Sequence, residues 1–228
     1  MGDVIFAAKL DHGLFGSLRR DAGEAWHAYI EHPFVLALGA GTLPEAAFRA
    51  YLVQDYLFLI QFARAYALAG YKSGNLAELR AAGAAMTAIV DVEMPLHVSY
   101  CRGWGLSEAD MEATPEAMQT VAYTRFVLDR GTSGDRLDLD VALAPCVIGY
   151  AEVANLLKAH PATKLDGNPY AAWIEMYAGP EYQTVAIAAI DGLERTGAAR
   201  GANARYPDLL RTFVAATALE TEFWQMSL

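Results

Sequence analysis

The chain has 228 residues, of which 54% are hydrophobic and 19% are charged; this composition excludes a disordered chain and supplies enough apolar material for one large core. The formal net charge of -10, without any basic run, argues against nucleic acid and anionic membrane surfaces as partners. No apolar stretch approaches the roughly 18 residues that a transmembrane helix requires, and the charges of Asp3, Lys9 and Asp11 argue against a secretory signal. We therefore expect a soluble, cytoplasmic protein with a single domain over residues 1–228.

Apolar residues recur with the spacing of α-helices in nearly every segment, and alternating strand patterns are absent, so the sequence predicts an all-α fold. A helix is predicted from about Phe15 to Glu31, because the His32-Pro33 step that follows disfavours helical geometry. The Thr42–Glu45 segment has the pattern of a capping box with proline in the first turn. It predicts a helix from there to about Tyr71.

Polar segments mark the ends of the next helices. Ser107 with Asp110, and the segment Thr114–Glu116, have the patterns of two helix starts. The polar segment Arg130–Asp140 is predicted to be a loop. We therefore expect long helices on both sides of this loop.

The last two predicted helices are bounded by proline. A short helix is expected between Asn168-Pro169 and Gly179-Pro180, and Tyr206–Asp208 is expected to open the final helix. Long helices with short connections predict an up-and-down bundle. The segment Val141–Leu157 is apolar on more than one face, which indicates burial inside the domain or at a subunit interface, so we also expect a homo-oligomer.

Cys146 lies within this apolar segment, directly after Pro145. A proline inside a helix removes one backbone hydrogen bond and favours a kink, and Tyr150 follows one turn later on the same face as Cys146. A thiol and a phenol beside a kink can form the wall of a pocket. The local pattern alone favours the simpler interpretation, in which both side chains are packed in the core.

Two carboxylates lie in apolar, aromatic surroundings. Asp55 is in the middle of a helix rich in aromatic residues, where a buried carboxylate must be paired or must bind a polar ligand; a structural hydrogen bond is an equally good explanation. Glu220 shares a helix face with Phe223 and Trp224, and such surroundings raise the pKa of a carboxyl group and suit a general acid. The alternative for Glu220 is a surface charge near the end of the chain.

Two glutamate–histidine pairs have spacings that occur in metal sites. Glu93 and His97 are four residues apart, and Glu24 and His27 are three apart. Di-metal helical bundles use the three-residue spacing twice, whereas this chain has it once, so structural contacts are the favoured interpretation of both pairs. We expect no metal and no other cofactor, while an oxidase that holds haem or two metals in a helical bundle stays open as an alternative.

A set of short segments spread along the chain forms one specific combination. The segments are His32–Val35, Gly41–Pro44, Gln54–Leu59, Glu93–His97, Ala144–Cys146 with Tyr150 and Glu152, Trp173-Ile174 with Tyr177, and Glu220 with Phe223-Trp224. In this order they resemble the TenA family, also called thiaminase II or aminopyrimidine aminohydrolase. Each segment alone is a weak signal, but jointly they are specific and cover nearly the whole chain.

The resemblance implies an all-α bundle of the haem-oxygenase-like fold and assembly as a homotetramer. It also implies hydrolysis of a small pyrimidine substrate, 4-amino-5-aminomethyl-2-methylpyrimidine, which is a product of thiamin degradation. The products are the 5-hydroxymethyl pyrimidine, which feeds thiamin salvage, and ammonia. Many members of the family also cleave thiamin itself.

The resemblance further implies roles for individual residues. Cys146 matches the family's nucleophile and Glu220 matches its acid/base glutamate, while Asp55 matches the aspartate that binds the amino group and a ring nitrogen of the pyrimidine. Phe58 stands where many relatives have tyrosine, which keeps the stacking surface and removes one hydroxyl. The other implied pocket residues are Tyr123, Tyr150, Tyr177 and Phe223.

The implied chemistry is covalent catalysis, in which the Cys146 thiolate adds to the electron-poor ring while an acid protonates a ring nitrogen. A hydrogen bond from Tyr150 is one expected source of the thiolate, and aromatic neighbours are expected to keep a proton on Glu220. A non-enzymatic regulator or ligand-binding protein stays open as an alternative, although the acidic balance and the lack of a basic helix disfavour contact with DNA.

Overall fold

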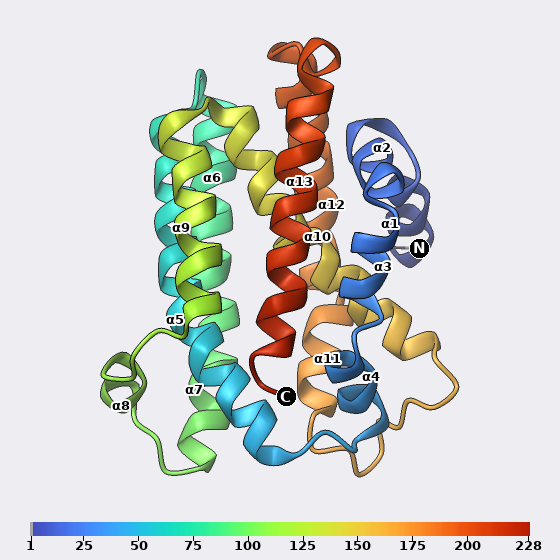
Figure 1. The fold of residues 1–228 in the computed structure, drawn as a ribbon, viewed down its shortest axis with the longest axis vertical. Coiled ribbons are helices and arrows are strands. Elements are labelled where there is room, and N and C mark those ends of the chain that lie inside the picture. The colour runs from blue at the N-terminus through green and yellow to red at the C-terminus, as the bar shows by residue number, and fades with distance from the viewer. Residues whose placement is uncertain (1) are drawn as a thin grey trace.

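The structure, a computed structural model, describes residues 2–228. These residues form thirteen α-helices and one π-helix, and none of them lies in a β-strand, which confirms the predicted all-α class (Figure 1). Within the same residues, no helix is both long and apolar enough to cross a membrane. In chain order the helices are α1 (Gly2–Leu10), α2 (Gly13–Ala22), α3 (Glu24–Ile30), α4 (Pro33–Ala40), α5 (Glu45–Tyr71), α6 (Leu76–Ala88), the π-helix η1 (Ile89–Glu93), α7 (Met94–Gly103), α8 (Glu108–Glu112), α9 (Met118–Ser133), α10 (Arg136–Ala159), α11 (Ala171–Ala178), α12 (Pro180–Ala199) and α13 (Ala202–Gln225).

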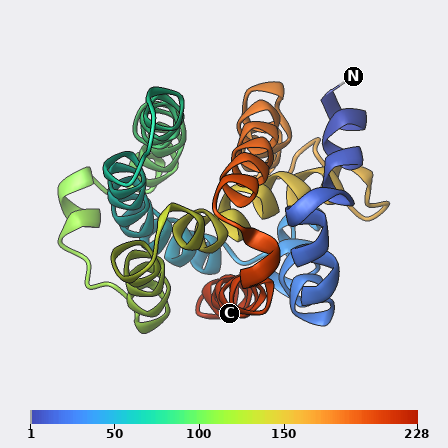
Figure 2. The same ribbon diagram turned by 90° about the horizontal axis from the view of Figure 1, so that it is seen from above.

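α10 is the central helix of the bundle and packs against α9, α11, α12 and α13. The view along the long axis shows the long helices side by side, with α1 to α3 at one flank and α8 outside the bundle at the other (Figure 2). Every residue from Val141 to Ala154 is buried, as the apolar pattern of this segment predicted. Gly149 permits this packing, because a β-carbon there would lie 2.4 Å from the ring of Tyr29.

The N-terminal part of the chain differs from the prediction at two helix boundaries. The helix expected over Phe15–Glu31 is divided into α2 and α3 by Gly23, whose φ of 51° lies in the region that glycine favours. The capping box expected at Thr42 is also wrong, because α5 begins at Glu45 and the Thr42 hydroxyl instead donates to a backbone carbonyl of α4 at 3.4 Å. The predicted end of α5 near Tyr71 is confirmed.

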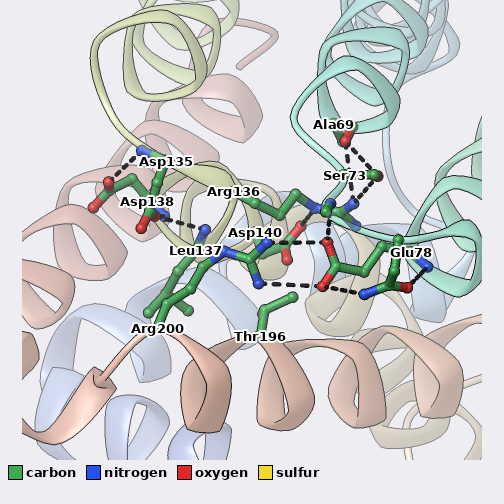
Figure 3. A network of polar contacts seen from close by, with 12 residues as sticks. Ala69, Ser73, Glu78, Asp135, Arg136, Leu137, Asp138, Asp140, Thr196 and Arg200 are labelled. Atoms are coloured by element: carbon green, nitrogen blue, oxygen red, sulfur yellow. Dashed lines mark hydrogen bonds and ion pairs between the residues drawn. The ribbon is translucent and has the colours of Figure 1, made fainter.

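The polar segment Arg130–Asp140 is not the loop that the sequence predicted. Gly134 and Asp135 alone separate α9 from α10. Asp135 caps α10, because its carboxylate accepts hydrogen bonds from the backbone amides of Leu137 and Asp138 at 2.9 and 3.2 Å (Figure 3). The polar composition of this segment therefore reflects helix capping and ion pairing rather than an extended loop.

Later boundaries agree with the prediction in part. The predicted helix start at Ser107 and Asp110 is confirmed, since these residues form a capping box at the start of α8, and α11 ends before Gly179 as expected. The predicted start at Thr114–Glu116 is wrong, because α9 begins after this segment. The predicted start of the last helix is also wrong: α13 begins upstream and includes Pro207 in its interior, at the cost of one backbone hydrogen bond.

A buried polar network joins α5, α6, α10 and α12 at one end of the bundle (Figure 3). The guanidinium of Arg136 donates from Nε to Asp140 at 2.7 Å, and from Nη1 to the Ser73 hydroxyl at 3.1 Å and to a backbone carbonyl of α5 at 3.2 Å. Arg200, the residue that follows α12, forms an ion pair with Glu78 of α6 at 3.0 Å. Arg136 thus ties the first turn of α10 to the end of α5, and the Arg200–Glu78 pair ties the end of α12 to α6.

Replacing Arg136 by methionine is expected to lower the free energy of unfolding by about 3 kcal/mol, because the nearly buried Asp140 carboxylate loses its ion-pair partner. Urea unfolding followed by circular dichroism measures this loss. Arg211→Met is the matched control, since Arg211 and Asp208 form an exposed pair whose loss is expected to cost less than about 1 kcal/mol. Equal, small losses in both variants would contradict the role assigned to Arg136.

Candidate functional site

Cys146 lies at the wall of a cavity of about 280 Å³ that α5, α6, η1, α10, α11 and α12 surround. Most side chains around this cavity are apolar or aromatic, and Glu93 of η1 faces it together with Cys146. Glu175 and Glu181 lie at its exposed mouth. A small, mostly apolar cavity with a few convergent polar groups is the usual form of a small-molecule site.

Glu220, Cys146 and Tyr123 form one cluster of polar side chains behind this cavity. Glu220 comes from α13 and is 1% exposed, and its Oε1 accepts a hydrogen bond from the Tyr123 hydroxyl of α9 at 2.8 Å. The Cys146 thiol of α10 lies close enough to this carboxyl group for each to shift the pKa of the other. Burial raises the pKa of Glu220 to about 8, against the opposing effect of the hydrogen bond from Tyr123, so Glu220 holds a proton at neutral pH.

The surroundings of Cys146 favour the neutral thiol over the thiolate. Burial raises the pKa of Cys146 well above its ordinary value, and the neighbouring charges of Glu220 and Glu93 raise it further. The expected hydrogen bond from Tyr150 to the thiol is wrong, because the Tyr150 hydroxyl instead lies 3.4 Å from the Tyr51 hydroxyl. The single proton of Tyr51 goes to Asp55 at 2.8 Å, which leaves Tyr150 as the donor in this pair. Cys146 therefore rests as a thiol.

Asp55 of α5 is the centre of a second buried cluster. It is 2% exposed, and its Oδ2 accepts hydrogen bonds from the Tyr51 hydroxyl at 2.8 Å and from Nε2 of His97 at 2.7 Å. The Trp173 indole donates to the Tyr51 hydroxyl at 3.3 Å. Asp55 is thus paired and held in one orientation, as the sequence required of a buried carboxylate.

Hydrogen-bond acceptors face both ring nitrogens of His97. Its Nδ1 faces the backbone carbonyl of Glu93 at 3.0 Å and its Nε2 faces the Asp55 carboxylate, and both of these oxygens are acceptors. Burial lowers the pKa of His97, but the hydrogen bond and charge of Asp55 outweigh burial and raise it overall. The two acceptors thus favour a proton on each ring nitrogen, and the pair is fully enclosed in the protein.

Glu93 is the residue of this region that the sequence did not assign to the site. It ends the π-helix η1, and its Oε1 accepts a hydrogen bond from the Tyr177 hydroxyl of α11 at 2.6 Å. Burial and the charge of Asp55 raise the pKa of Glu93 to about 7. The spacing of Glu93 and His97 was visible in the sequence, but it was interpreted only as a metal-type or structural pair.

Aromatic rings link the Glu220 cluster to the Asp55 cluster. Phe58 packs against Tyr123 and Phe223 with centroid distances of 5.0 and 5.4 Å, and Phe223 meets Tyr51 edge to face at 6.1 Å. On the side of Asp55, the rings of Tyr150 and Tyr177 pack together with a centroid distance of 5.0 Å. All the residues that the sequence assigned to a site thus gather in one region, namely Asp55, Phe58, Tyr123, Cys146, Tyr150, Tyr177, Glu220 and Phe223.

The two glutamate–histidine pairs lie in different surroundings. Glu93 and His97 are in the interior, whereas Glu24 and His27 are exposed on α3, where His27 pairs with Glu31 at 3.5 Å. Over the part of the chain that the structure describes, no group of three or more His, Cys, Asp or Glu side chains is arranged to hold a metal ion. The expected structural contact is present for Glu93 and His97, through the backbone carbonyl of Glu93, whereas His27 pairs with Glu31 instead of Glu24.

The fold and the site define an all-α protein whose central helix holds a thiol close to a protonated carboxyl group, beside a buried aspartate–histidine pair. Residues 19–228 match the model of the TENA/THI-4/PQQC family, and the chain belongs to this family. The match covers the elements that carry both clusters. Membership confirms the resemblance seen in the short sequence segments.

Relatives of known sequence and structure agree with this assignment. The chain is 40% identical to an uncharacterized protein of Haemophilus influenzae, over 92% of this chain and 97% of that protein. It is 35% identical to the aminopyrimidine aminohydrolase of Halalkalibacterium halodurans, over 92% of this chain and 93% of the relative. The crystal structure of a TenA family transcription regulator from Silicibacter sp. superposes with a TM-score of 0.90 at 45% identity, over 96% of this chain and 98% of that one.

Proposed function

We propose that the protein is an aminopyrimidine aminohydrolase that converts 4-amino-5-aminomethyl-2-methylpyrimidine and water to the 5-hydroxymethyl pyrimidine and ammonia, in thiamin salvage. The observation that carries this proposal is the joint burial of the Cys146 thiol and the protonated Glu220, which are close enough for each to shift the pKa of the other. The name of the relative in Halalkalibacterium halodurans supports the same reaction. Cleavage of thiamin at the same methylene carbon is the second proposed activity.

Asp55 is proposed to orient the pyrimidine. The hydrogen bonds from Tyr51 and His97 both reach Oδ2, so Oδ1 is the oxygen that is left to accept from the amino group of the ring. Phe58 and Phe223 offer flat apolar faces on which a heteroaromatic ring can stack. A fixed acceptor and stacking faces hold the reacting carbon near the thiol, which lowers the entropic part of the barrier.

Glu220 and Cys146 are proposed to act as one proton-transfer unit. Protonated Glu220 gives its proton to a ring nitrogen, which makes the ring a better electrophile, and the resulting carboxylate takes the proton of the Cys146 thiol as sulfur bonds to the ring. The electron-rich adduct expels the leaving group from the exocyclic methylene carbon, and water adds there. Sulfur then leaves as the protons return along the same route, so the raised pKa of the thiol is compatible with its role as nucleophile.

The proposed reaction is tested by incubating the purified protein with the aminomethyl pyrimidine and, in parallel, with thiamin. Formation of the hydroxymethyl pyrimidine, measured by liquid chromatography and mass spectrometry, is the expected result. The relative named a transcription regulator makes DNA binding the second candidate function, although the net charge of -10 opposes it. Turnover of neither substrate would refute the hydrolase proposal.

We also propose that residues 1–228 act as one domain and assemble as a cytoplasmic homotetramer. Apolar side chains are exposed along α6 and η1, at Leu76, Leu79, Val90 and Val92, and such a patch is typical of an interaction surface. Light scattering coupled to size-exclusion chromatography is expected to give the mass of a tetramer. Val92→Glu is expected to reduce this mass, and a wild-type monomer at micromolar concentration would contradict the proposal.

A further inference from the structure

Glu93 occupies an unusual position in the backbone. The run of helix from α6 to α7 is interrupted by the π-helical turn Ile89–Glu93. Such turns occur mostly as single interruptions of α-helices and are frequent at functional sites. Glu93 is the last residue of this turn and lines the cavity together with Cys146. Glu220 and Asp55, at 1% and 2% exposed, are more deeply enclosed.

The proposed hydrolysis requires two proton transfers that neither buried carboxyl group is free to make. Glu220 exchanges protons with Cys146 and the ring nitrogen, and Asp55 is committed to His97 and Tyr51. An amine leaves carbon readily only when it receives a proton, and water adds readily only when it gives one up. Both events take place at the exocyclic methylene carbon, where the leaving group must point toward open space.

We propose that Glu93 is the acid that protonates the departing amine and then the base that accepts a proton from the incoming water. This inference rests on the proposed function and adds a third carboxyl group to it. As the bond from the methylene carbon to nitrogen breaks, the bonding pair goes to nitrogen, the Glu93 proton follows, and ammonia is released. Water then forms the new carbon–oxygen bond and gives its proton to the Glu93 carboxylate. The cycle consumes one water, releases one ammonia and returns Glu93 to its starting state.

The contacts of Glu93 suit this double role. Tyr177 donates to Oε1, so Oε2 is the oxygen available to exchange protons with the leaving group. The titratable groups that face Glu93 are Asp55 and Tyr66 of α5, His97 of α7, Cys146 of α10, Tyr177 of α11, Tyr182 of α12 and Glu220 of α13. Burial and Asp55 favour its protonated form, while His97 and Tyr177 favour the carboxylate, and the net pKa is about 7. A group with this pKa exchanges protons in both directions at neutral pH.

Thiamin provides an internal comparison, because its leaving group departs as a neutral thiazole and needs no proton. Glu93 then acts only as the base toward water. Removing its carboxyl group therefore affects both substrates, but it removes two functions for the amine and one for thiamin. If Glu93 had only a structural role, its replacement would lower the rates for both substrates alike and leave their ratio unchanged.

The test compares Glu93→Gln with wild type on both substrates. The kcat for the aminomethyl pyrimidine is expected to fall by about 10²–10⁴-fold, with a clearly smaller fall for thiamin and little change in KM. The wild-type kcat for the amine is expected to decline in two steps as pH rises, near pH 7 where Glu93 loses its proton and near pH 8 where Glu220 does. Glu93→Gln is expected to lose the limb near pH 7 and to keep the one near pH 8. Glu181→Gln is the matched control at the mouth of the same cavity and is expected to retain the wild-type ratio.

Three outcomes distinguish this inference from the proposed function. Turnover of neither substrate by the wild-type protein refutes the proposed function, and the role of Glu93 with it. Active wild type, with an unchanged rate ratio and an unchanged limb near pH 7 in Glu93→Gln, refutes the role of Glu93 alone. If Glu93→Gln does not fold, Tyr177→Phe provides the test. Loss of the Tyr177 hydrogen bond raises the pKa of Glu93, so the limb of the kcat profile that belongs to Glu93 must move to higher pH. A limb that does not move overturns the assignment.

Discussion

Cys146→Ser is expected to lower kcat for pyrimidine hydrolysis by about 10³-fold or more, as removal of a nucleophile does in other covalent mechanisms. The burial and neighbouring carboxyl groups that raise the pKa of the Cys146 thiol also disfavour an alkoxide. The hydroxyl of serine is a far weaker acid than the thiol of cysteine, so Glu220 is too weak a base to activate it. Steady-state kinetics measure the loss, and a circular dichroism spectrum checks that the helical fold is kept.

Cys101→Ser is the matched control for this substitution. Cys101 is fully buried in α7, and burial raises its pKa to about 11, but it does not share the proximity to Glu220 that distinguishes Cys146. Its replacement is expected to leave kcat nearly unchanged. Wild-type turnover by Cys146→Ser would rule out the covalent mechanism.

Glu220→Gln is expected to lower kcat by about 10²–10⁴-fold with little change in KM, because glutamine keeps the size and polarity of the side chain but cannot cycle a proton. The sign of the pH dependence follows from the raised pKa. The protonated form of Glu220 starts the reaction and prevails below about pH 8, so wild-type kcat should decline as pH rises through this value. Glu220→Gln should lose this decline.

Asp55→Asn is the informative comparison for Glu220→Gln. An amide breaks the ion pair with His97 and turns one acceptor into a donor, so the pyrimidine loses its orienting contact in the ground state and in the transition state. KM is therefore expected to rise while kcat falls. A Glu220→Gln variant that binds substrate poorly but keeps wild-type kcat and pH profile would make Glu220 a binding residue instead.

Much of the fold was accessible from local patterns. Helical periodicity is enough to predict an all-α protein, because the spacing of apolar residues reports which face of each helix is buried. The apolar segment around Cys146 predicted a helix buried on all sides, and α10 has this property. Boundaries were less accessible: Gly23 ends a helix through its backbone conformation, and the polar residues near Asp135 form a cap that composition alone does not distinguish from a loop.

The sequence by itself determined the class of fold, the family and the residues that gather at the site, because these follow from periodicity and from short segments in a fixed order. Only the tertiary structure decided what each side chain touches. Tyr150 pairs with Tyr51 rather than with Cys146, and Glu93 reaches the cavity through a π-helical turn. The pKa values of Glu93 and Glu220 depend on burial and on charges from other helices. Both effects arise from distances in space between residues far apart in the chain, which no local pattern contains.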